Sequence, residues 1–283
     1  MSGFEGFCKG VNYMEVTALV ENTTKNKTLA CMHGLSLFVK TKKHNILIDA
    51  ANSDLFYLNS KKLNIDISDV DICIITHGHN DHGGGLECFL KNNKKAKIYI
   101  QRLAFENYFA CVDGAKNYIG LDKSLISGRF VLLDGDFKID EQISLITKPQ
   151  IKHDTPFFNS YLFKEQNNTL IKDDFLHEQS VIIQENGKAV LIGGCAHNGV
   201  LNILDDALLK FKKIDAVVSG FHLYNPGLNL TDEKAIPKLV EKLKNYGTKI
   251  YTCHCTGFTA YEKLKSALGG KIEYLSTGEE ITV

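Results

Sequence analysis

The chain has 283 residues, 44% of them hydrophobic, and its 33 Lys and Arg residues balance 33 Asp and Glu residues. A chain of this length can bury a core sufficient for independent folding, and we expect one domain over residues 1–283. The zero net charge gives no general attraction to nucleic acid or anionic membranes, and no apolar stretch reaches the roughly 20 residues of a membrane-spanning helix. We therefore expect neither nucleic-acid nor membrane partners. The start, residues 1–5, lacks the pattern of an export signal, so we expect a cytoplasmic protein.

Eight cysteines are scattered along the chain, several of them within apolar segments. In a chain of this size the scatter favours reduced thiols buried as small hydrophobic side chains over a disulfide framework. Cys253 and Cys255 are the exception, because they flank His254. Both would lie on the opposite side of an extended backbone from the histidine, so we expect them to pack rather than to bind a metal.

The first half of the chain predicts strands mixed with helices. Apolar runs at 35–40 and 45–49 flank a polar turn and predict a β-hairpin. Further along, the pattern of apolar residues predicts a helix over 53–62, a buried strand over 70–75, a strand over 96–100 and a helix over 103–109.

The second half predicts another hairpin, at 180–183 and 189–192, joined by an Asn186-Gly187 turn. Alternating elements follow, with helices over 198–211, 231–246 and 256–268 and strands over 215–219 and 249–252. The alternation implies sheets covered by helices, while the hairpins imply mixed rather than fully parallel sheets. The predicted fold class is therefore α/β.

Two long stretches, 110–128 and 147–177, match no element. Loops of this length in a compact domain are often binding elements. We therefore expect them to form the walls of the substrate site.

The run Thr76-His77-Gly78-His79-Asn80-Asp81-His82 places three imidazoles and a carboxylate directly after the predicted strand 70–75. Imidazole nitrogen and carboxylate oxygen suit zinc, iron or manganese. His77 and His79, two residues apart in extended backbone, can bind one ion from the same side, and Asp81 and His82 would then face a second ion. The run thus predicts a metal site rather than a polar surface loop.

Three further histidines, His197, His222 and His254, also follow apolar strands directly. His77 and His79 hold the same position after their own strand, so neighbouring strands of one sheet would bring all five to one edge, where α/β active sites form. The alternative for each is a histidine held by the backbone at a strand end.

The remaining histidines divide by their surroundings. His177 precedes the second hairpin and could also reach the site. His33 opens the first hairpin and is expected to contact the ligands of the site without binding the metal. His44 lies in a lysine-rich turn and is expected to face solvent, and His153 lies in a stretch without a predicted element.

These features together resemble the metallo-β-lactamase superfamily over essentially the whole chain. The His-x-His-x-Asp-His run, the upstream strand 46–49 and the strand-end histidines carry the resemblance. Four segments are further similar to the branch of dihydropterin ribofuranosylaminobenzene phosphate synthase-like metal-dependent hydrolases: His33-Gly34-Leu35-Ser36, Gly194-Cys195-Ala196-His197-Asn198-Gly199, Gly220-Phe221-His222-Leu223 and His254-Cys255-Thr256-Gly257.

The resemblance implies a four-layer αβ/βα sandwich with two mixed sheets and a dinuclear metal site at the edge between them. It implies two divalent metal ions, zinc in the first place, with iron or manganese as the alternatives. Carried over residue by residue, His77 and His79 would bind one metal, Asp81 and His82 the other, and His254 would complete the second site.

Two positions depart from the superfamily pattern. Asp49-Ala50-Ala51 replaces an Asp-Thr-Gly-like turn, and we expect Asp49, like His33, to support the ligands without binding a metal. Gly194-Cys195 replaces a Gly-Asp whose carboxylate bridges the metals in many members. For the missing ligand of the first site we favour His197, because it lies just beyond that strand end; His177 and a Cys195 thiolate remain the alternatives.

The resemblance also implies a metal-dependent hydrolase. Two metals roughly 3.5–4 Å apart would hold a hydroxide ready to attack a small ester, lactone or phosphoester, with a pterin-related substrate as a family-level expectation. Asp81 would orient the hydroxide and accept its proton, and His222 would donate a proton to the leaving group or bind a substrate oxygen. An iron-dependent redox enzyme on the same scaffold and a metal-binding module without hydrolase activity are the alternatives. The sequence leaves the oligomeric state open.

Overall fold

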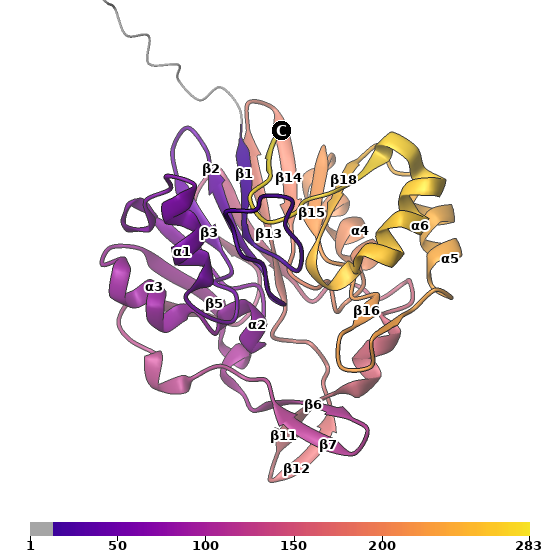
Figure 1. Ribbon diagram of the computed structural model, residues 1–283, viewed down its shortest axis with the longest axis horizontal. Helices are drawn as coiled ribbons and strands as arrows, with labels where there is room; N and C mark the ends of the chain where they lie inside the picture. Colours follow the sequence, from indigo (N-terminus) through magenta and orange to yellow (C-terminus); the bar gives the residue numbers. More distant parts are fainter. Residues whose placement is uncertain (1–13) are drawn as a thin grey trace, which may run out of the picture.

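The computed structural model describes residues 14–283, so Cys8 and the start of the chain discussed above lie outside it. Over these residues two seven-stranded mixed sheets form the centre of the fold (Figure 1). In the first sheet, β20 to β3 pair antiparallel and β3 to β8 pair parallel. Its strands, in spatial order, are β20 (Glu280–Thr282), β1 (Glu15–Val20), β2 (Ser36–Lys40), β3 (Asn45–Ile48), β4 (Ile72–Ile74), β5 (Lys97–Gln101) and β8 (Phe130–Leu133).

The second sheet combines parallel and antiparallel pairing in the same way. Its parallel half carries β19 to β14, and its antiparallel half continues from β14 to β9 through the predicted second hairpin. The spatial order is β19 (Ile272–Tyr274), β18 (Lys249–Thr252), β15 (Ala216–Ser219), β14 (Lys188–Ile192), β13 (Gln179–Glu185), β10 (Ile143–Thr147) and β9 (Phe137–Lys138).

Helices cover the outer face of each sheet (Figure 1). The first sheet packs against α1 (Leu55–Lys62) and α3 (Leu86–Asn92), and the second packs against α4 (Val200–Phe211), α5 (Ile236–Leu243) and α6 (Phe258–Leu268). Between the sheets, Leu37 and Ile74 from one and Val181 and Val190 from the other share a fully buried apolar core. The predicted four-layer α/β arrangement with two mixed sheets is confirmed. Within residues 14–283 no helix is both long enough and apolar enough to cross a membrane.

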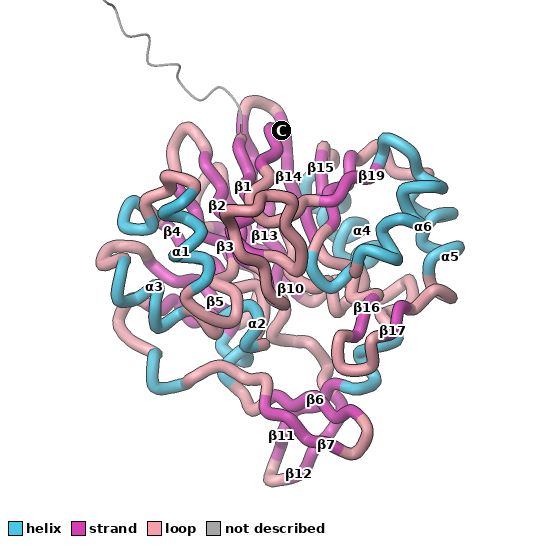
Figure 2. The backbone as a smooth tube through the Cα atoms, viewed as in Figure 1, coloured by secondary structure: helices cyan, strands magenta, loops and turns pink. Residues whose placement is uncertain are grey.

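The stretches that predicted no element contain a third sheet at one end of the molecule (Figure 2). Its strands are β12 (Thr169–Lys172), β11 (Leu162–Gln166), β6 (Tyr108–Val112) and β7 (Ala115–Tyr118). The helix predicted over 103–109 is wrong: a short 3₁₀ turn, Arg102–Phe105, is followed directly by β6, which pairs with β11. Pairing with a strand distant in sequence overrides the local apolar pattern.

A smaller error concerns the helix predicted over 231–246. The chain first forms a two-stranded ribbon of β16 (Tyr224–Asn225) and β17 (Leu230–Thr231), and α5 begins only at Ile236. The ribbon lies beside the third sheet in the view of Figure 2.

The strand ends that carry histidines meet across both sheets. Neighbouring strands β14, β15 and β18 are parallel and in register, so His197, His222 and His254 follow strand ends at one edge of the second sheet. His77 and His79 follow β4, which belongs to the first sheet. The expectation of a single shared sheet was therefore wrong, and the groups converge across the seam between two sheets.

Asp140 joins the turn of the first hairpin to the turn before β10. Its carboxylate accepts hydrogen bonds from Lys43 Nζ at 2.8 Å and from the backbone N–H of Ile143 at 2.9 Å, and it lies 2.7 Å from His44 Nε2. His44 is thus held at the interface of two turns, with its side chain only 15% exposed, rather than facing solvent as expected. Partial burial alone would raise the pKa of Asp140, but its hydrogen-bond donors hold it well below the ordinary value.

We predict that Asp140→Asn lowers the free energy of unfolding by about 1–2 kcal/mol at neutral pH, because it weakens several charge-assisted hydrogen bonds. Since the folded-state pKa of Asp140 is depressed, its contribution is present above the unfolded pKa of about 4 and disappears as the pH falls through the lower folded value. Denaturant unfolding at several pH values measures both effects. Glu141→Gln is the control, because Glu141 contacts the same Lys43 at 3.7 Å with an 89% exposed side chain. Equal stability of the two variants would contradict the role given to Asp140.

Candidate metal centre

The buried carboxylate of Asp49 fixes the loop that follows β4. One oxygen accepts the backbone N–H of Thr76 at 2.7 Å, and the other accepts the Thr76 hydroxyl at 2.7 Å and a ring N–H from His82 Nδ1 at 2.6 Å. Asp49 itself has a left-handed backbone conformation, with φ of 58°. Such strain in a non-glycine residue persists only where the surrounding contacts over-determine it. The bond to His82 Nδ1 leaves the other ring nitrogen, Nε2, facing Cys195 and His254 of the second sheet.

A first cluster consists of His77, His79 and His197, each of which places a ring nitrogen within 4.8 Å of the others. Their Nε2 atoms are buried and have no hydrogen-bond partner among residues 14–283. Burial, together with the neighbouring imidazoles, lowers the pKa of His77 and His197 well below the ordinary value, so both rings are neutral. Buried polar atoms normally have partners, and neutral imidazoles are metal ligands. The three side chains therefore fit a metal ion.

A second cluster, adjacent to the first, consists of Asp81, His82, Cys195 and His254. His82 Nε2 lies 3.2 Å from both His254 Nε2 and Cys195 Sγ, and Asp81 Oδ2 lies 3.3 Å from His254 Nε2. Nitrogen, carboxylate and thiolate donors that converge at this spacing suit zinc or iron. Burial alone would raise the pKa of Asp81, but the surrounding histidines hold it well below the ordinary value.

Polar groups behind the clusters hold the rings in place. Asn159 Oδ1 lies 2.9 Å from His197 Nδ1, and Asn22 Oδ1 lies 2.9 Å from His254 Nδ1. Hydrogen bonds of this kind fix the tautomer and orientation of a metal-binding imidazole. Neither asparagine was identified from sequence, because each lies in a connection without a recognisable motif.

His33 lies beside the second cluster rather than within it. Its Nε2 is 3.2 Å from Asp81 Oδ2, and its ring is 4.8 Å from that of His254. Burial opposes protonation of His33, but the Asp81 carboxylate raises its pKa above the ordinary value. His33 therefore contacts the candidate ligand Asp81 without belonging to the cluster, as Asp49 contacts His82.

His177 is placed outside the two clusters, because both of its ring nitrogens already have partners. Its Nδ1 accepts the backbone N–H of Gly78 at 2.9 Å, and its Nε2 lies 3.1 Å from the buried carboxylate of Asp173. Its neighbour Glu178 accepts the backbone N–H groups of His197 and Asn198. The segment 173–178 thus holds the backbone of the two loops that carry the ligands of the first cluster.

Close backbone approach at Gly194 brings the two sheets together. A Cβ atom at this position would lie 2.3 Å from Thr76 Oγ1 and 3.1 Å from His77 Nδ1. A larger residue would therefore push the β14 end away from the loop after β4. This proximity also places Cys195 against the second cluster.

One residue lies near the clusters in a way that the sequence did not indicate. Cys255, expected to pack, lies with Cys195 and His222 in a further group of donor atoms within 4.8 Å of one another. Cys253 behaves as expected and is fully buried in the core between the sheets. His222 lies beside the first cluster, with its ring 4.3 Å from that of His197, and lines the cavity described below.

The clusters open into a cavity of about 500 Å³, a size that suits a small-molecule ligand. Its far walls come from the third sheet, through residues such as Val112 and Asn117, from Phe158 and Tyr161, and from the ribbon at Tyr224. The two stretches without predicted elements thus supply much of the wall. None of the residues that line this cavity within the described chain is Lys or Arg.

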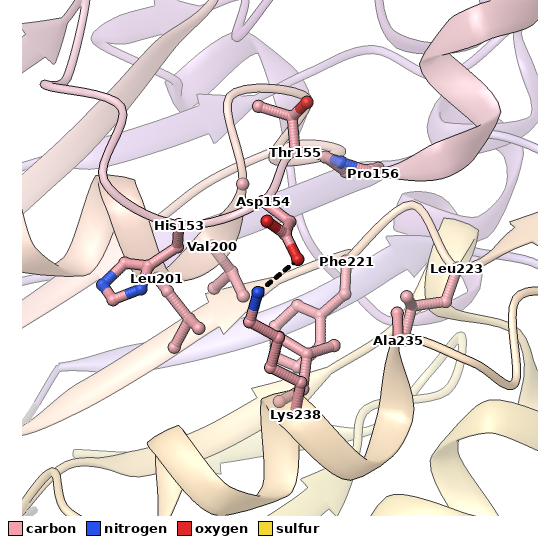
Figure 3. Close-up of a pocket in the computed structure, with 12 residues that line it drawn as sticks. His153, Asp154, Thr155, Pro156, Val200, Leu201, Phe221, Leu223, Ala235 and Lys238 are labelled. Carbon is pink, nitrogen blue, oxygen red and sulfur yellow. Dashed lines mark hydrogen bonds and ion pairs between the residues drawn. The ribbon is translucent and has the colours of Figure 1, made fainter.

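A second hollow, of about 60 Å³, lies behind the loops that carry His197 and His222. Figure 3 shows its apolar lining, with Phe221 and Val200, and the ion pair of Asp154 with Lys238. Its volume is too small for a substrate, so the larger cavity is the one that serves the clusters.

Comparison with known proteins agrees with this architecture. A family model of the metallo-beta-lactamase superfamily matches residues 30–164. The 7,8-dihydropterin-6-methyl-4-(beta-D-ribofuranosyl)-aminobenzene-5'-phosphate synthase of Methanocaldococcus jannaschii is 28% identical to this chain, over 90% of the chain and 92% of that protein. A metal-dependent hydrolase of Bacillus velezensis is 31% identical over 41% of this chain and 51% of its own length.

Among solved structures, Tm1679, described as a metal-dependent hydrolase of the beta-lactamase superfamily, superposes with a TM-score of 0.81 and 27% sequence identity. The superposition covers 96% of this chain and 99% of Tm1679. Together with the sandwich of two mixed sheets, these matches show that the chain has the metallo-beta-lactamase fold and is similar in sequence to that superfamily over residues 30–164.

Proposed function

We propose that this protein is a dinuclear metal-dependent hydrolase of a small ester, lactone or phosphoester. The observation that carries the proposal is the pair of adjacent donor clusters. In one of them three buried imidazole Nε2 atoms make no hydrogen bond within the described chain, although that of His79 lies 3.6 Å from the Asp173 carboxylate. In a protein interior such atoms are costly unless they bind something. A cavity of about 500 Å³ gives a substrate access to both clusters.

His77, His79 and His197 would hold one ion, and Asp81, His82, Cys195 and His254 the other. A pair of divalent metal ions bound here would acidify a coordinated water and polarise the scissile bond of the substrate. The protein's own contribution is to fix these donors through Asp49, Asn159 and Asn22, so that little reorganisation is needed during reaction.

Asp81 is the residue we propose as proton acceptor. Its carboxylate lies at the inner end of the cavity and carries a pKa held well below the ordinary value, so it is ionised and can orient an attacking water. His33, 3.2 Å from Asp81 Oδ2, is placed to share a proton taken up there.

The cavity walls suit a substrate with a flat, uncharged ring system. Tyr161, Phe158 and Tyr224 offer aromatic surface, and Asn117 and Asn225 offer amide hydrogen bonds. No Lys or Arg of the described chain lines the walls. The negative charge of a substrate phosphate would therefore have to be neutralised by metal ions bound at the clusters. The archaeal relative, whose name includes a dihydropterin and an aminobenzene ring, makes a pterin-related compound a reasonable first substrate to test.

We predict that His79→Ala and Asp81→Ala each lower the metal content by about one ion per chain while leaving the fold intact. Asp81→Ala should also reduce turnover by about 10²-fold or more. Elemental analysis of protein purified without added metal, followed by phosphodiester, phosphomonoester, lactone and thioester assays, measures both. His153→Ala is the control, because His153 pairs with Asp205 at 2.9 Å outside the clusters. Full metal content in both ligand variants would overturn the proposal.

A second prediction separates His197 from His177. His197→Ala should lose metal and activity together, because it removes one of three donors of the first cluster. His177→Gln should keep its metal, since its ring nitrogens face Gly78 and Asp173, and lose about 1–3 kcal/mol of stability through imperfect hydrogen bonds. Metal analysis and thermal unfolding of the two variants test this. Metal loss only in the 177 variant would reverse the assignment.

A third prediction concerns the cavity wall. Tyr161→Ala should raise KM by about threefold to tenfold with little change in kcat, because it removes ring contact with bound substrate and leaves the metal clusters untouched. Phe157→Ala is the matched control, since Phe157 is 59% exposed and does not line the cavity. Steady-state kinetics on the best substrate of the panel compare the two, and equal effects would remove Tyr161 from the substrate site.

A further inference from the structure

A third group of donors lies next to the two clusters, and two of its three members, His222 and Cys255, have no role in the function proposed above. The Sγ atoms of Cys195 and Cys255 and a ring nitrogen of His222 lie within 4.8 Å of one another. All three residues also line the large cavity. Two sulfur atoms and one imidazole at this spacing form a donor set typical of zinc sites that keep a fourth position open.

The loops after β15 and β18 are built to bring this group together. The backbone N–H of Phe221 donates to Thr256 Oγ1 at 2.9 Å, and the backbone N–H of His222 donates to Cys255 Sγ at 3.2 Å. A Cβ atom at position 220 would lie 2.4 Å from Cys255 Sγ, so only glycine leaves room for the sulfur. The contacts join the loops and hold the thiol against the β15 end.

His222 shows the property expected of a ligand. Both of its ring nitrogens are shielded from solvent and have no hydrogen-bond partner in the described part of the chain. Its backbone adopts the left-handed conformation, with φ of 48°, as does that of His254. Strain of this kind in non-glycine residues concentrates at functional sites, where the surrounding structure holds it.

We propose that Cys195, His222 and Cys255 form a third cation site, for a thiolate-binding divalent ion such as zinc, beside the dinuclear centre. Cys195 belongs to both this group and the second cluster, so its sulfur is shared between the two. The Cys255 thiolate and the shared Cys195 thiolate would supply negative charge that favours a divalent ion in a buried position. All three residues line the cavity, so a substrate oxygen or sulfur could reach an ion bound by them.

The test uses the full chain, stripped of metal with a chelator and titrated with Co(II) or Cd(II). Thiolate-to-metal absorption and elemental analysis report the number of ions bound. His222→Ala and Cys255→Ser should each bind one ion fewer than the unaltered chain. The thiolate-to-metal absorption that the last equivalent of metal adds in the unaltered chain should be absent in both variants. Cys253→Ala is the control, because this neighbouring thiol is buried in the core, and it should keep the full number of ions.

Because the His222 ring makes no hydrogen bond within residues 14–283, His222→Ala is expected to fold, and it carries the test even if Cys255→Ser does not. Unchanged metal content and absorption in His222→Ala would overturn the third site. Retained metal with lost turnover in that variant would likewise overturn it, and would make His222 a proton donor or substrate-binding residue. The result is separable from the dinuclear proposal, which depends instead on His79→Ala and Asp81→Ala.

Discussion

The structure depends on one constraint: buried nitrogen, oxygen and sulfur donors from two sheets meet at a seam where several of them have no partner in the described chain. Hydrophobic burial between the sheets brings the strand ends together, and Gly194 allows the closest approach. The packing energy of the core therefore holds neutral imidazoles in a position that is unfavourable until a cation binds. Metal binding and the stability of this seam are linked for that reason.

Orientation of the donors comes from a surrounding set of carboxylates and amides. Asp49 aligns His82, Asn159 aligns His197 and Asn22 aligns His254, each through the ring nitrogen that is not needed for a metal. Most of these partners lie on segments far from the ligand in sequence. Such bonds hold the ligands in their binding orientation before a metal is present. The hydrogen bonds of Asp49 also offset the cost of its left-handed backbone conformation.

The cavity divides its tasks between two kinds of structure. Most of the donors follow strands of the two central sheets, while much of the wall comes from the third sheet and the β16–β17 ribbon, which lie on long connections. Connections of this kind vary more readily than the elements that they join. Relatives can therefore share the sandwich and the metal site without sharing a substrate.

The sequence by itself determined the α/β class, the two hairpins and the His-x-His-x-Asp-His run, because alternating patterns and short motifs are local properties. It also marked 110–128 and 147–177 as binding walls, although it could not show that they form a sheet. The pattern of strand ends suggested one shared sheet, whereas the family resemblance implied a site between two sheets, as the structure has it. Only the tertiary structure decided that His177 faces Gly78 and Asp173 and that Cys255 joins His222. Those outcomes depend on which distant strands pair and which side chains then share a buried space, and no local pattern encodes either.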